Sequence, residues 1–484
     1  MLEMTIRQAM LMMKGKLLNP GADTEKKMPP VSIDSRSLEK GEAFFALVGE
    51  RLDGHSFLRE VLPAGPGLVV LSDRTPLDDR KGRVLITDVV WNDNFYDGNL
   101  RVPFLQVEDT TTALQDLARG IRELWGGPLI GITGSMGKTT TKYYASRLLE
   151  KTLRVHSSSG NFNNHIGLPL SITTLEDSHQ ISILELGMNH PGEIRRLSEI
   201  CRPDTALVTN VAPVHLEFFE SIDEIADAKA EIIENIKPGG RLVFNLDDEL
   251  IAERAADFNG RKTTFGFSET ADVRITDLEI NGIDDTSFKL SVSKWDATLP
   301  LRLKATGKSG AFNLAAAVAA TLDYGLEPDM VTEAVPSLLS PEQRGTVRQV
   351  KGVTIWDDSY NSNPAALISL LESLRGLEGF GRIILVLGDM LELGERSAEL
   401  HESCGRAVAE SGAAALFTVG KDSPMISRGA YAEGFPADQI FSFASSGEAA
   451  VPVKNFLLED DLLIIKGSRG VKMEAIIDHL KEEL

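Results

Sequence analysis

The chain has 484 residues, enough for about two to four domains, and 42% of them are hydrophobic, so each domain can bury a core of its own. Its 50 basic and 71 acidic residues give a net charge of −21, which disfavours a nucleic-acid partner or an anionic membrane surface. The two cysteines, Cys201 and Cys404, are too few for a disulfide framework or a cysteine-based zinc site.

The beginning of the chain predicts a small α/β domain. Residues 1–18 mix apolar and charged side chains, which indicates an amphipathic helix and not a signal peptide. Short apolar runs follow at 43–48 and 68–71, and residues 90–103 have no clear period, so we expect a loop insertion there. No apolar run approaches the ~20 residues that span a bilayer, and we expect a cytoplasmic protein.

From residue 128 strands and helices alternate. Strands are predicted at 128–133, 181–186, 206–209 and 242–245. The first is followed by a predicted helix at 138–151, and such alternation implies crossover connections and a parallel sheet. Residues 273–303 alternate apolar and polar, as antiparallel strands do, and an Ala-rich helix is predicted at 311–322.

A further α/β unit follows residues 327–343, a stretch with Pro and Glu that we interpret as a domain boundary. Its strands are predicted at 353–356, 383–387, 416–419 and 462–465. The unit has about the size of one domain and again predicts a parallel sheet.

The strongest chemical signal is GITGSMGKTTT at 131–141, which follows an apolar strand and opens a helix. Gly134 and Gly137 allow the backbone to approach phosphate oxygens, and a helix N-terminus adds a favourable field. Lys138 can reach the β- and γ-phosphates and Thr139 can place its hydroxyl on magnesium. The strict pattern has glycine where this chain has Ile132, so the loop is a variant. The other loop residues in the predicted nucleotide site are Ser135, Met136 and Thr140.

Two polar residues follow strands of the same predicted sheet. Glu185 lies at the end of one strand and His215 shortly after the next. Ligands of open parallel sheets collect outside the carboxyl ends of strands, so both side chains could face the phosphate loop and bind magnesium. A hydrogen-bonded structural role is the alternative for each. By pattern alone, Lys229 in ADAKAEII is a solvated helix lysine.

Three polar segments lie at strand-to-helix junctions of the last unit. They are WDDSYNSNP at 356–364, which contains Asn361 and Asn363, LGDMLELG at 387–394 and KGSRG at 466–470. Each alone could be a polar turn, but three on one sheet edge favour a binding surface. Arg344 adds a cation near that edge.

Taken together, these motifs resemble the Mur ligase family, the amide-forming enzymes of peptidoglycan precursor synthesis. The resemblance is carried by TGSMGKTT at 133–140, GNFNNHIGLP at 160–169, LELGMNHPGEI at 184–194, HLEFF at 215–219, AKAEI at 228–232, DDSYNSNP at 357–364, GDMLELG at 388–394 and KGSRG at 466–470. SIDSR at 32–36 and FFALVGERLDGHSF at 44–57 resemble the family's UDP-binding domain. The motifs cover nearly the whole chain in the family's order.

The resemblance implies an α/β protein of three domains. Residues 1–107 form a small N-terminal α/β domain that binds the UDP end of the substrate, 108–336 a central P-loop-type parallel-sheet ATPase domain, and 337–484 a C-terminal Rossmann-like α/β domain that binds the acceptor. The implied substrates are ATP, UDP-N-acetylmuramoyl-tripeptide and D-alanyl-D-alanine, which react through an acyl phosphate to give ADP and phosphate. We expect a monomer without a nucleic-acid or membrane partner.

The resemblance also assigns roles to single residues. Thr139, Glu185 and His215 contact Mg2+, and Lys229 carries a carbamate that supplies a further oxygen ligand, in place of the solvated-lysine interpretation. Other implied contacts are Asn313 with adenine, Arg344 and Asp358 with the nucleotide, and Ser35, Arg36, Asp53, Gly54 and His55 with the UDP region. The family usually has a His-Asn pair shortly before the adenine Asn, where this chain has Ser309 and Gly310.

Three alternatives remain. A second family member could add a single amino acid to a UDP-muramoyl peptide. A folylpolyglutamate synthase would share the phosphate loop, but the N-terminal domain argues against it. A non-catalytic nucleotide-binding regulator would keep the loop and would need neither Glu185, His215 nor Lys229.

Overall fold

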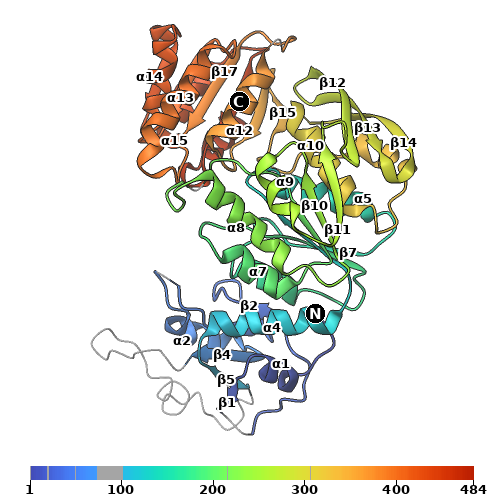
Figure 1. The fold of residues 1–484 in the computed structure, drawn as a ribbon. Helices are drawn as coiled ribbons and strands as arrows, with labels where there is room; N and C mark the ends of the chain where they lie inside the picture. The colour runs from blue at the N-terminus through green and yellow to red at the C-terminus, as the bar shows by residue number, and fades with distance from the viewer. Residues whose placement is uncertain are drawn as a thin grey trace. The chain divides into compact units, whose positions relative to one another are not determined.

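The computed structural model describes residues 2–18, 21–49, 51–72, 102–214, 216–305, 307–375 and 377–483. The expected insertion at 90–103 lies outside these ranges except for its last two residues, and His215 lies outside them too. Three separate sheets organise the described chain, each with helices beside it, which confirms the predicted α/β fold class (Figure 1).

The N-terminal sheet has five strands in the order β1-β5-β4-β3-β2. The strands are β1 (Lys16–Leu17), β2 (Val31–Ser32), β3 (Ala43–Phe45), β4 (Leu68–Ser72) and β5 (Phe104–Val107). Only β1 is antiparallel to its neighbour. Helix α1 (Ile6–Met12) begins at a capping box formed by Thr5 and Gln8, and α2 (Leu58–Val61) contributes Leu58 to the core.

The central sheet has nine strands in the order β14-β13-β12-β11-β10-β9-β6-β8-β7. The strands are β6 (Leu129–Thr133), β7 (Val155–Ser157), β8 (Ile181–Glu185), β9 (Thr205–Val208), β10 (Arg241–Asn245), β11 (Arg261–Gly266), β12 (Val273–Gly282), β13 (Asp285–Val292) and β14 (Ala297–Leu303). Strands β9 to β12 are parallel and β12 to β14 antiparallel, as the change in periodicity predicted. Strands β7 and β11 were not predicted.

Helices precede, connect and follow the strands of the central sheet. They are α4 (Thr110–Trp125), α5 (Lys138–Leu149), α6 (Gly167–Thr173), α7 (Glu193–Cys201), α8 (Ile222–Glu234), α9 (Glu249–Ala256), α10 (Gly307–Thr321) and α11 (Pro328–Ala334). The Ala-rich α10 is buried along most of its length and packs on α5, β11 and β12, because small side chains allow close approach on several sides. Helix α11 lies inside the stretch that we interpreted as a boundary.

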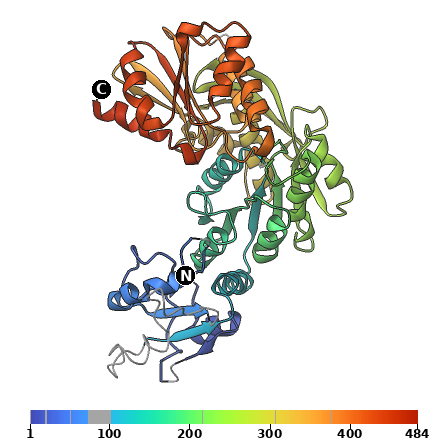
Figure 2. The same ribbon diagram turned by 90° about the vertical axis from the view of Figure 1, so that its left-hand side faces the viewer.

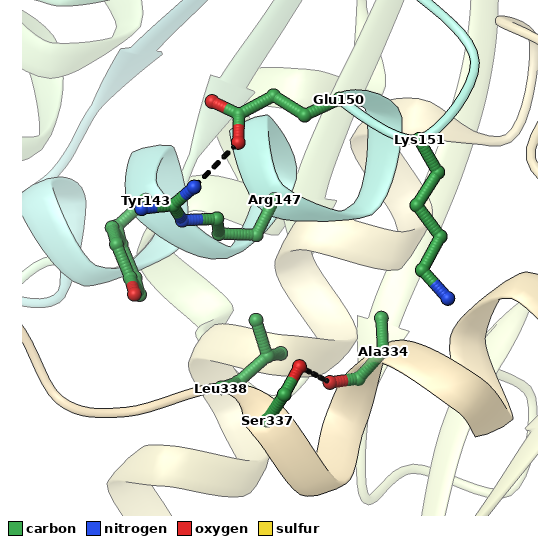
Figure 3. Close-up of a pocket in the computed structure, with 7 residues that line it drawn as sticks. All are labelled: Tyr143, Arg147, Glu150, Lys151, Ala334, Ser337 and Leu338. Carbon is green, nitrogen blue, oxygen red and sulfur yellow. Dashed lines mark hydrogen bonds and ion pairs between the residues drawn. The ribbon is translucent and has the colours of Figure 1, made fainter.

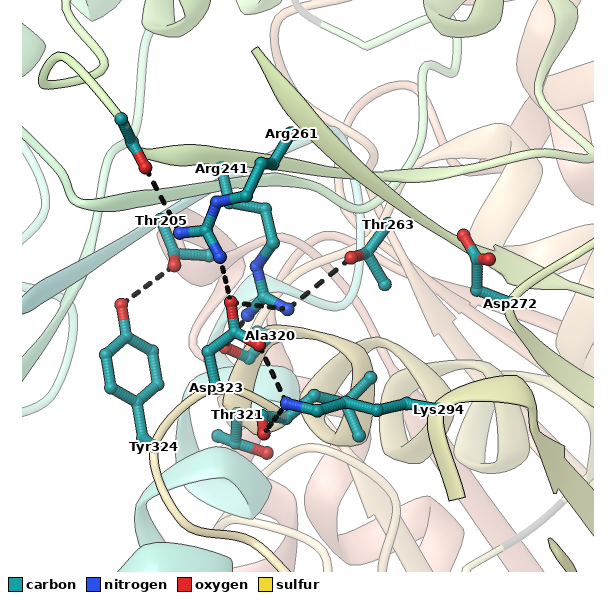
Figure 4. A network of polar contacts seen from close by, with 12 residues as sticks. Thr205, Arg241, Arg261, Thr263, Asp272, Lys294, Ala320, Thr321, Asp323 and Tyr324 are labelled. Carbon is teal, nitrogen blue, oxygen red and sulfur yellow. Dashed lines mark hydrogen bonds and ion pairs between the residues drawn. The ribbon is translucent and has the colours of Figure 1, made fainter. Parts of the chain in front are cut away.

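A buried cation ties the start of β10 to the end of α10 (Figure 4). Arg241 is 3% exposed and donates from Nη2 to the carbonyl of Ala320 at 2.8 Å. Its Nη1 lies 3.6 Å from the carboxylate of Asp323, which also accepts from Arg261 at 2.7 Å and from Lys294 at 2.9 Å. One carboxylate therefore balances three cations from separate segments.

The C-terminal sheet has six strands in the order β15-β16-β20-β17-β18-β19. The strands are β15 (Thr346–Val350), β16 (Val353–Asp358), β17 (Ile383–Gly388), β18 (Ala415–Val419), β19 (Ile440–Phe443) and β20 (Leu462–Lys466). All neighbours are parallel except β15, an antiparallel edge strand. The half-exposed TVRQV of β15 was missed because it lacks the apolar run of a buried strand.

Both faces of the C-terminal sheet are covered by helices (Figure 2). The helices are α12 (Pro364–Leu374), α13 (Ser397–Ala409), α14 (Pro424–Ala432), α15 (Ser446–Phe456) and α16 (Glu474–Glu483). Along β20, Leu462 and Ile464 join one hydrophobic cluster and Leu463 and Ile465 the other. Burial on both sides explains the continuous apolar runs that predicted these strands.

In the described part of the chain, no helix is long and apolar enough to cross a membrane.

Candidate active site

Two glycines shape the loop between β6 and α5. Gly134 has φ +140°, and a Cβ there would lie 1.9 Å from Oγ1 of Thr209. Gly137 has φ +81°, and a Cβ there would lie 2.2 Å from Oδ1 of Asn313. Both positions need glycine, because left-handed backbone and close packing each exclude a side chain. Packing within the protein accounts for glycine at both positions, and their role in the approach of phosphate oxygens stays a prediction.

The start of α5 combines a glycine N-cap with the ammonium group of Lys138. Gly137 is its N-cap residue and provides no side-chain cap, so no side chain of that residue occupies the space before the first turn. The ammonium of Lys138 donates to the carbonyls of Gly134 at 2.6 Å and Ser135 at 3.3 Å, which places this cation over the loop. Thr139 and Thr140 follow and are half-buried.

The interpretation of Lys229 as a solvated lysine is wrong, because its side chain is 2% exposed. It lies on α8 on the same face as Ile225 and Ile232, which are fully buried. Burial, and next the charge of Lys138, lower the pKa of Lys229 well below the ordinary value. The amine is thereby shifted toward its neutral, nucleophilic form.

Glu185 is the last residue of β8 and is 2% exposed. Its Oε1 accepts a hydrogen bond from Nδ2 of Asn163 at 2.9 Å. The carbonyl of Asn163 accepts from the backbone N–H of Gly187 at 2.7 Å, and a Cβ at Gly187 would lie 2.9 Å from the Asn163 carboxamide. The sequence did not single out Asn163 within GNFNNHIGLP. Its contact with Glu185 joins residues 22 positions apart.

The magnesium set of Thr139, Glu185, His215 and Lys229 stays a prediction. Within the described ranges, no three His, Cys, Asp or Glu side chains are grouped to hold a metal ion, and His215 lies outside those ranges.

The segment after β9 was missed as part of the site. Oγ1 of Thr209 and the side chain of Asn210 both contact the backbone of Met136 in the phosphate loop. They begin the sequence TNVAP directly after a strand, so the strand-end rule applied to Glu185 also marks them.

Asn313 lies at the base of the phosphate loop on α10. Its Oδ1 accepts from the hydroxyl of Thr141 at 3.4 Å and faces Gly137. Ser309 is exposed, whereas a Cβ on Gly310 would lie 2.8 Å from Cβ of Ala305, so packing on the end of β14 accounts for glycine at this position. The contact of Asn313 with adenine stays a prediction.

The junctions of the C-terminal sheet contain an internal ion pair. Lys466, at the end of β20, is 3% exposed, and its Nζ donates to Asp358 at 2.6 Å and to the carbonyl of Asn361 at 3.0 Å. Oδ1 of Asn363 accepts from the N–H of Ala366 at 2.9 Å and caps α12. Asn363 therefore has a structural role, and the contacts of these residues with ligands stay predictions.

Two guanidinium groups of this domain share one aromatic ring. The guanidinium carbon of Arg344 lies 3.9 Å from the ring centroid of Tyr360, and that of Arg469 lies 5.8 Å from it. Arg469 also donates to Gln343 at 3.2 Å. Tyr360 thus brings the predicted nucleotide contact next to the KGSRG segment.

The carboxylate of Asp389, in GDMLELG, accepts three backbone N–H groups. They belong to Lys421 at 2.9 Å, Asp422 at 3.0 Å and Ser423 at 2.6 Å, just before α14. Asp389 is 7% exposed, so this motif residue serves the internal structure of the domain.

The residues predicted for the UDP region lie in the N-terminal domain. Nδ1 of His55 lies 2.7 Å from Asp53, and its Nε2 accepts from the N–H of Ser72 at 2.9 Å, so both ring nitrogens fix the Asp53-Gly54-His55 turn. Arg36 is exposed and forms three hydrogen bonds with Asp34, two from its guanidinium and one from its backbone N–H, which lower the pKa of that carboxyl to about 2. Ser35 lies between them and is half-buried, and the UDP contacts stay predictions.

A pocket of about 390 Å³ lies between α5 and the segment from α11 to Leu338 (Figure 3). It is lined by Tyr143, Arg147, Glu150, Lys151, Ala334, Ser337 and Leu338. Arg147 pairs with Glu150 at 2.7 Å and Lys151 with Glu333 at 3.0 Å, and none of the predicted site residues lines the pocket.

Comparison with known proteins relates the chain to a single protein family. Residues 30–122 match the Mur ligase family catalytic domain, 132–321 the Mur ligase middle domain and 343–469 the Mur ligase glutamate ligase domain. The UDP-N-acetylmuramoyl-tripeptide--D-alanyl-D-alanine ligase of Bacillus subtilis (strain 168) is 32% identical over 492 residues, covering 100% of this chain and 99% of the relative. The chain belongs to the Mur ligase family. The ligase of the same name from Escherichia coli (strain K12) is 30% identical over 490 residues, with coverage of 100% and 99%.

Solved structures of Mur ligases are similar to this chain in fold. A crystal structure of MurF from Acinetobacter baumannii has a TM-score of 0.85 at 28% identity and covers 99% of each chain. The MurF ligase of Thermotoga maritima in complex with ADP has a TM-score of 0.78 at 27% identity, covering 94% of this chain and 98% of that one. A folylpolyglutamate synthase of Mycobacterium tuberculosis shares the fold over 76% of this chain, with a TM-score of 0.60. The chain is therefore an ATP-dependent ligase of peptidoglycan synthesis, as the motif order implied.

Proposed function

We propose that this Mur ligase joins D-alanyl-D-alanine to the tripeptide carboxylate of UDP-N-acetylmuramoyl-tripeptide at the expense of ATP. The observation that carries the proposal is end-to-end similarity to ligases of that name, at 32% and 30% identity. A matching N-terminal domain at 30–122 supports a UDP-linked substrate over a folate.

Amide formation from a carboxylate needs activation, because its oxygen is a poor leaving group. The tripeptide carboxylate attacks the γ-phosphorus of ATP and ADP leaves, which gives an acyl phosphate. The dipeptide amine then attacks the acyl carbon, phosphate leaves, and the amine loses a proton. Lys138 and the backbone at the start of α5 stabilise negative charge on the transferring phosphoryl group.

The oxygen donors of the proposed metal site fit Mg2+, which prefers oxygen ligands, whereas a histidine nitrogen is an unusual ligand for this ion. The hydroxyl of Thr139 and the buried carboxylate of Glu185 would hold it, with His215 from outside the described residues. When bound, magnesium neutralises charge on the phosphates.

Lys229 carries a carbamate in this proposal. Its neutral amine attacks the carbon of CO2, a C–N bond forms and one proton is released, which leaves a carboxylate-like ligand. Burial on α8 and the lowered pKa of Lys229 support this step, because only the neutral amine reacts. Enzyme equilibrated with 13CO2 should show a carbamate carbon signal that disappears in Lys229→Arg, and the same signal in both proteins would contradict the assignment.

The proposed division of labour follows three domains, at 1–107, 108–336 and 337–484. Ser35, Arg36, Asp53, Gly54 and His55 serve the UDP region, and Asn361 and Asn363 the acceptor. Asn313, Arg344 and Asp358 contact the nucleotide.

We propose that the enzyme works as a cytoplasmic monomer. Light scattering of the purified chain tests its oligomeric state.

The deciding experiment measures phosphate release with ATP, UDP-muramoyl-tripeptide and a panel of acceptors. Release should require both the UDP-peptide and an amine, and D-alanyl-D-alanine should give the highest kcat/KM. Faster turnover with a single amino acid would identify another Mur-type ligase. ADP binding without turnover on any acceptor would identify a nucleotide-binding regulator.

A further inference from the structure

One peptide unit of the phosphate loop is held by the segment that follows β9. Oδ1 of Asn210 accepts from the N–H of Met136 at 2.9 Å, and its Nδ2 donates to the carbonyl of the same residue at 3.2 Å. Oγ1 of Thr209 donates to that carbonyl at 2.6 Å. The carboxamide therefore pairs with both polar groups of Met136, as a neighbouring β-strand would.

The residue before Met136 is bound by the same segment. The N–H of Ser135 donates to the carbonyl of Asn210 at 2.9 Å. Its hydroxyl donates to the carbonyl of Ala212 at 3.1 Å and accepts from the N–H of Ala212 at 2.9 Å. Gly134 lies directly against Thr209. Every residue from 134 to 136 thus contacts this segment.

The segment is also held by Asp248, a residue outside the phosphate loop. Oδ2 of Asp248 accepts from the N–H of Val211 at 2.6 Å, while its Oδ1 caps α9 by accepting from Ile251 at 3.3 Å. A helix N-cap thereby fixes Val211, which follows Asn210 in the chain. These contacts position the residue next to Asn210 from within the protein.

We propose that Asn210 is a positioning residue that holds the phosphate loop in its nucleotide-binding shape. It also engages two backbone N–H groups of the loop, which are then not available to phosphate oxygens. The N–H groups of Ser135 and Met136 donate to Asn210, so they are not the groups that bind phosphate oxygens. The phosphates are bound from Gly137 onward, at the beginning of α5. A loop held in this shape loses less conformational entropy when the nucleotide binds. The inference rests on the proposed binding of nucleotide by this loop.

The first test is calorimetry of ADP binding to the full chain. Asn210→Leu keeps a similar volume and removes both side-chain hydrogen bonds, so its Kd should rise about tenfold or more. Asn245→Leu is the matched control: Asn245 ends the neighbouring strand β10, is buried, and accepts a local hydrogen bond from Asp247 at 3.0 Å. Its Kd should stay within about twofold of wild type. Equal weakening in both variants, or none in Asn210→Leu, would overturn the proposal.

The second test uses the wild-type chain and does not depend on a variant that folds. Amide hydrogen exchange should find Ser135 and Met136 protected without nucleotide and unchanged by ADP, whereas Gly137 gains protection. If Ser135 and Met136 became protected only in the presence of ADP, the proposal that Asn210 already engages their N–H groups would be refuted. Failure of the wild type to bind ADP would instead count against the proposed function, and exchange without nucleotide would still decide whether the loop is held.

Discussion

Replacing Asp323 by Asn should destabilise the central region through Arg241. The substitution keeps the shape of the side chain and removes the negative charge that Arg241, Arg261 and Lys294 share. Burial alone raises the pKa of Asp323, but the Lys294 hydrogen bond and the Arg241, Lys294 and Arg261 charges outweigh it and lower the pKa. Its contribution to stability is thus complete above the unfolded pKa and is lost as pH falls through the folded one.

The size of the effect follows from the burial of each partner. Removing one member of a buried ion pair costs about 3–5 kcal/mol. Arg241 keeps Ala320 as an acceptor and lies 3.6 Å from the carboxylate, so we expect the lower end, about 3 kcal/mol. The side chains of Arg261 and Lys294 are 62% and 49% exposed, and their pairs add at most about 1 kcal/mol.

The assay is hydrogen exchange of the buried α10 amides at pH 7, which reports the free energy of opening this region. Asp285→Asn is the control: its partner Arg302 is 73% exposed, and the loss should stay below about 1 kcal/mol. Combining Asp323→Asn with Arg241→Met removes the unpaired charge and should recover most of the stability. A smaller loss in Asp323→Asn than in Asp285→Asn, or no recovery in the double variant, would refute the reasoning.

Three further predictions concern other sites. Lys138→Ala should abolish ADP binding and ligation with an unchanged circular dichroism spectrum, and near wild-type ligation would remove the phosphate-loop assignment. Burial and the nearby His179 lower the pKa of His156 to about 4, so the unfolded chain binds the proton first as pH falls. Stability should therefore drop by about 3 kcal/mol between pH 6.5 and 4, measured by urea unfolding, and His156→Gln should flatten this dependence. Asp389→Ala should destabilise the C-terminal domain by about 2 kcal/mol in the same assay, because three backbone amides lose their acceptor, and unchanged stability would contradict its capping role.

Features that depend on neighbouring residues were predictable from the sequence. The phosphate loop requires glycine, lysine and a helix start within a few positions, and all of them lie in 131–141. Periodicity likewise distinguished the parallel strands from the antiparallel ones at 273–303, because each strand carries its own burial pattern. The edge strand β15 was not predicted, because its half-exposed residues give only a weak hydrophobic pattern.

Only the tertiary structure decided the contacts between distant segments. The polar neighbours of Lys229 in the sequence indicate solvent, whereas the packing of α8 buries the side chain and lowers the pKa of its amine. Asn210 contacts Met136, which lies 74 positions away in the sequence, and Arg241 contacts Asp323 over a similar sequence separation. Such pairs arise where crossover connections bring strand ends together, and no local pattern in the chain encodes which side chains then face one another.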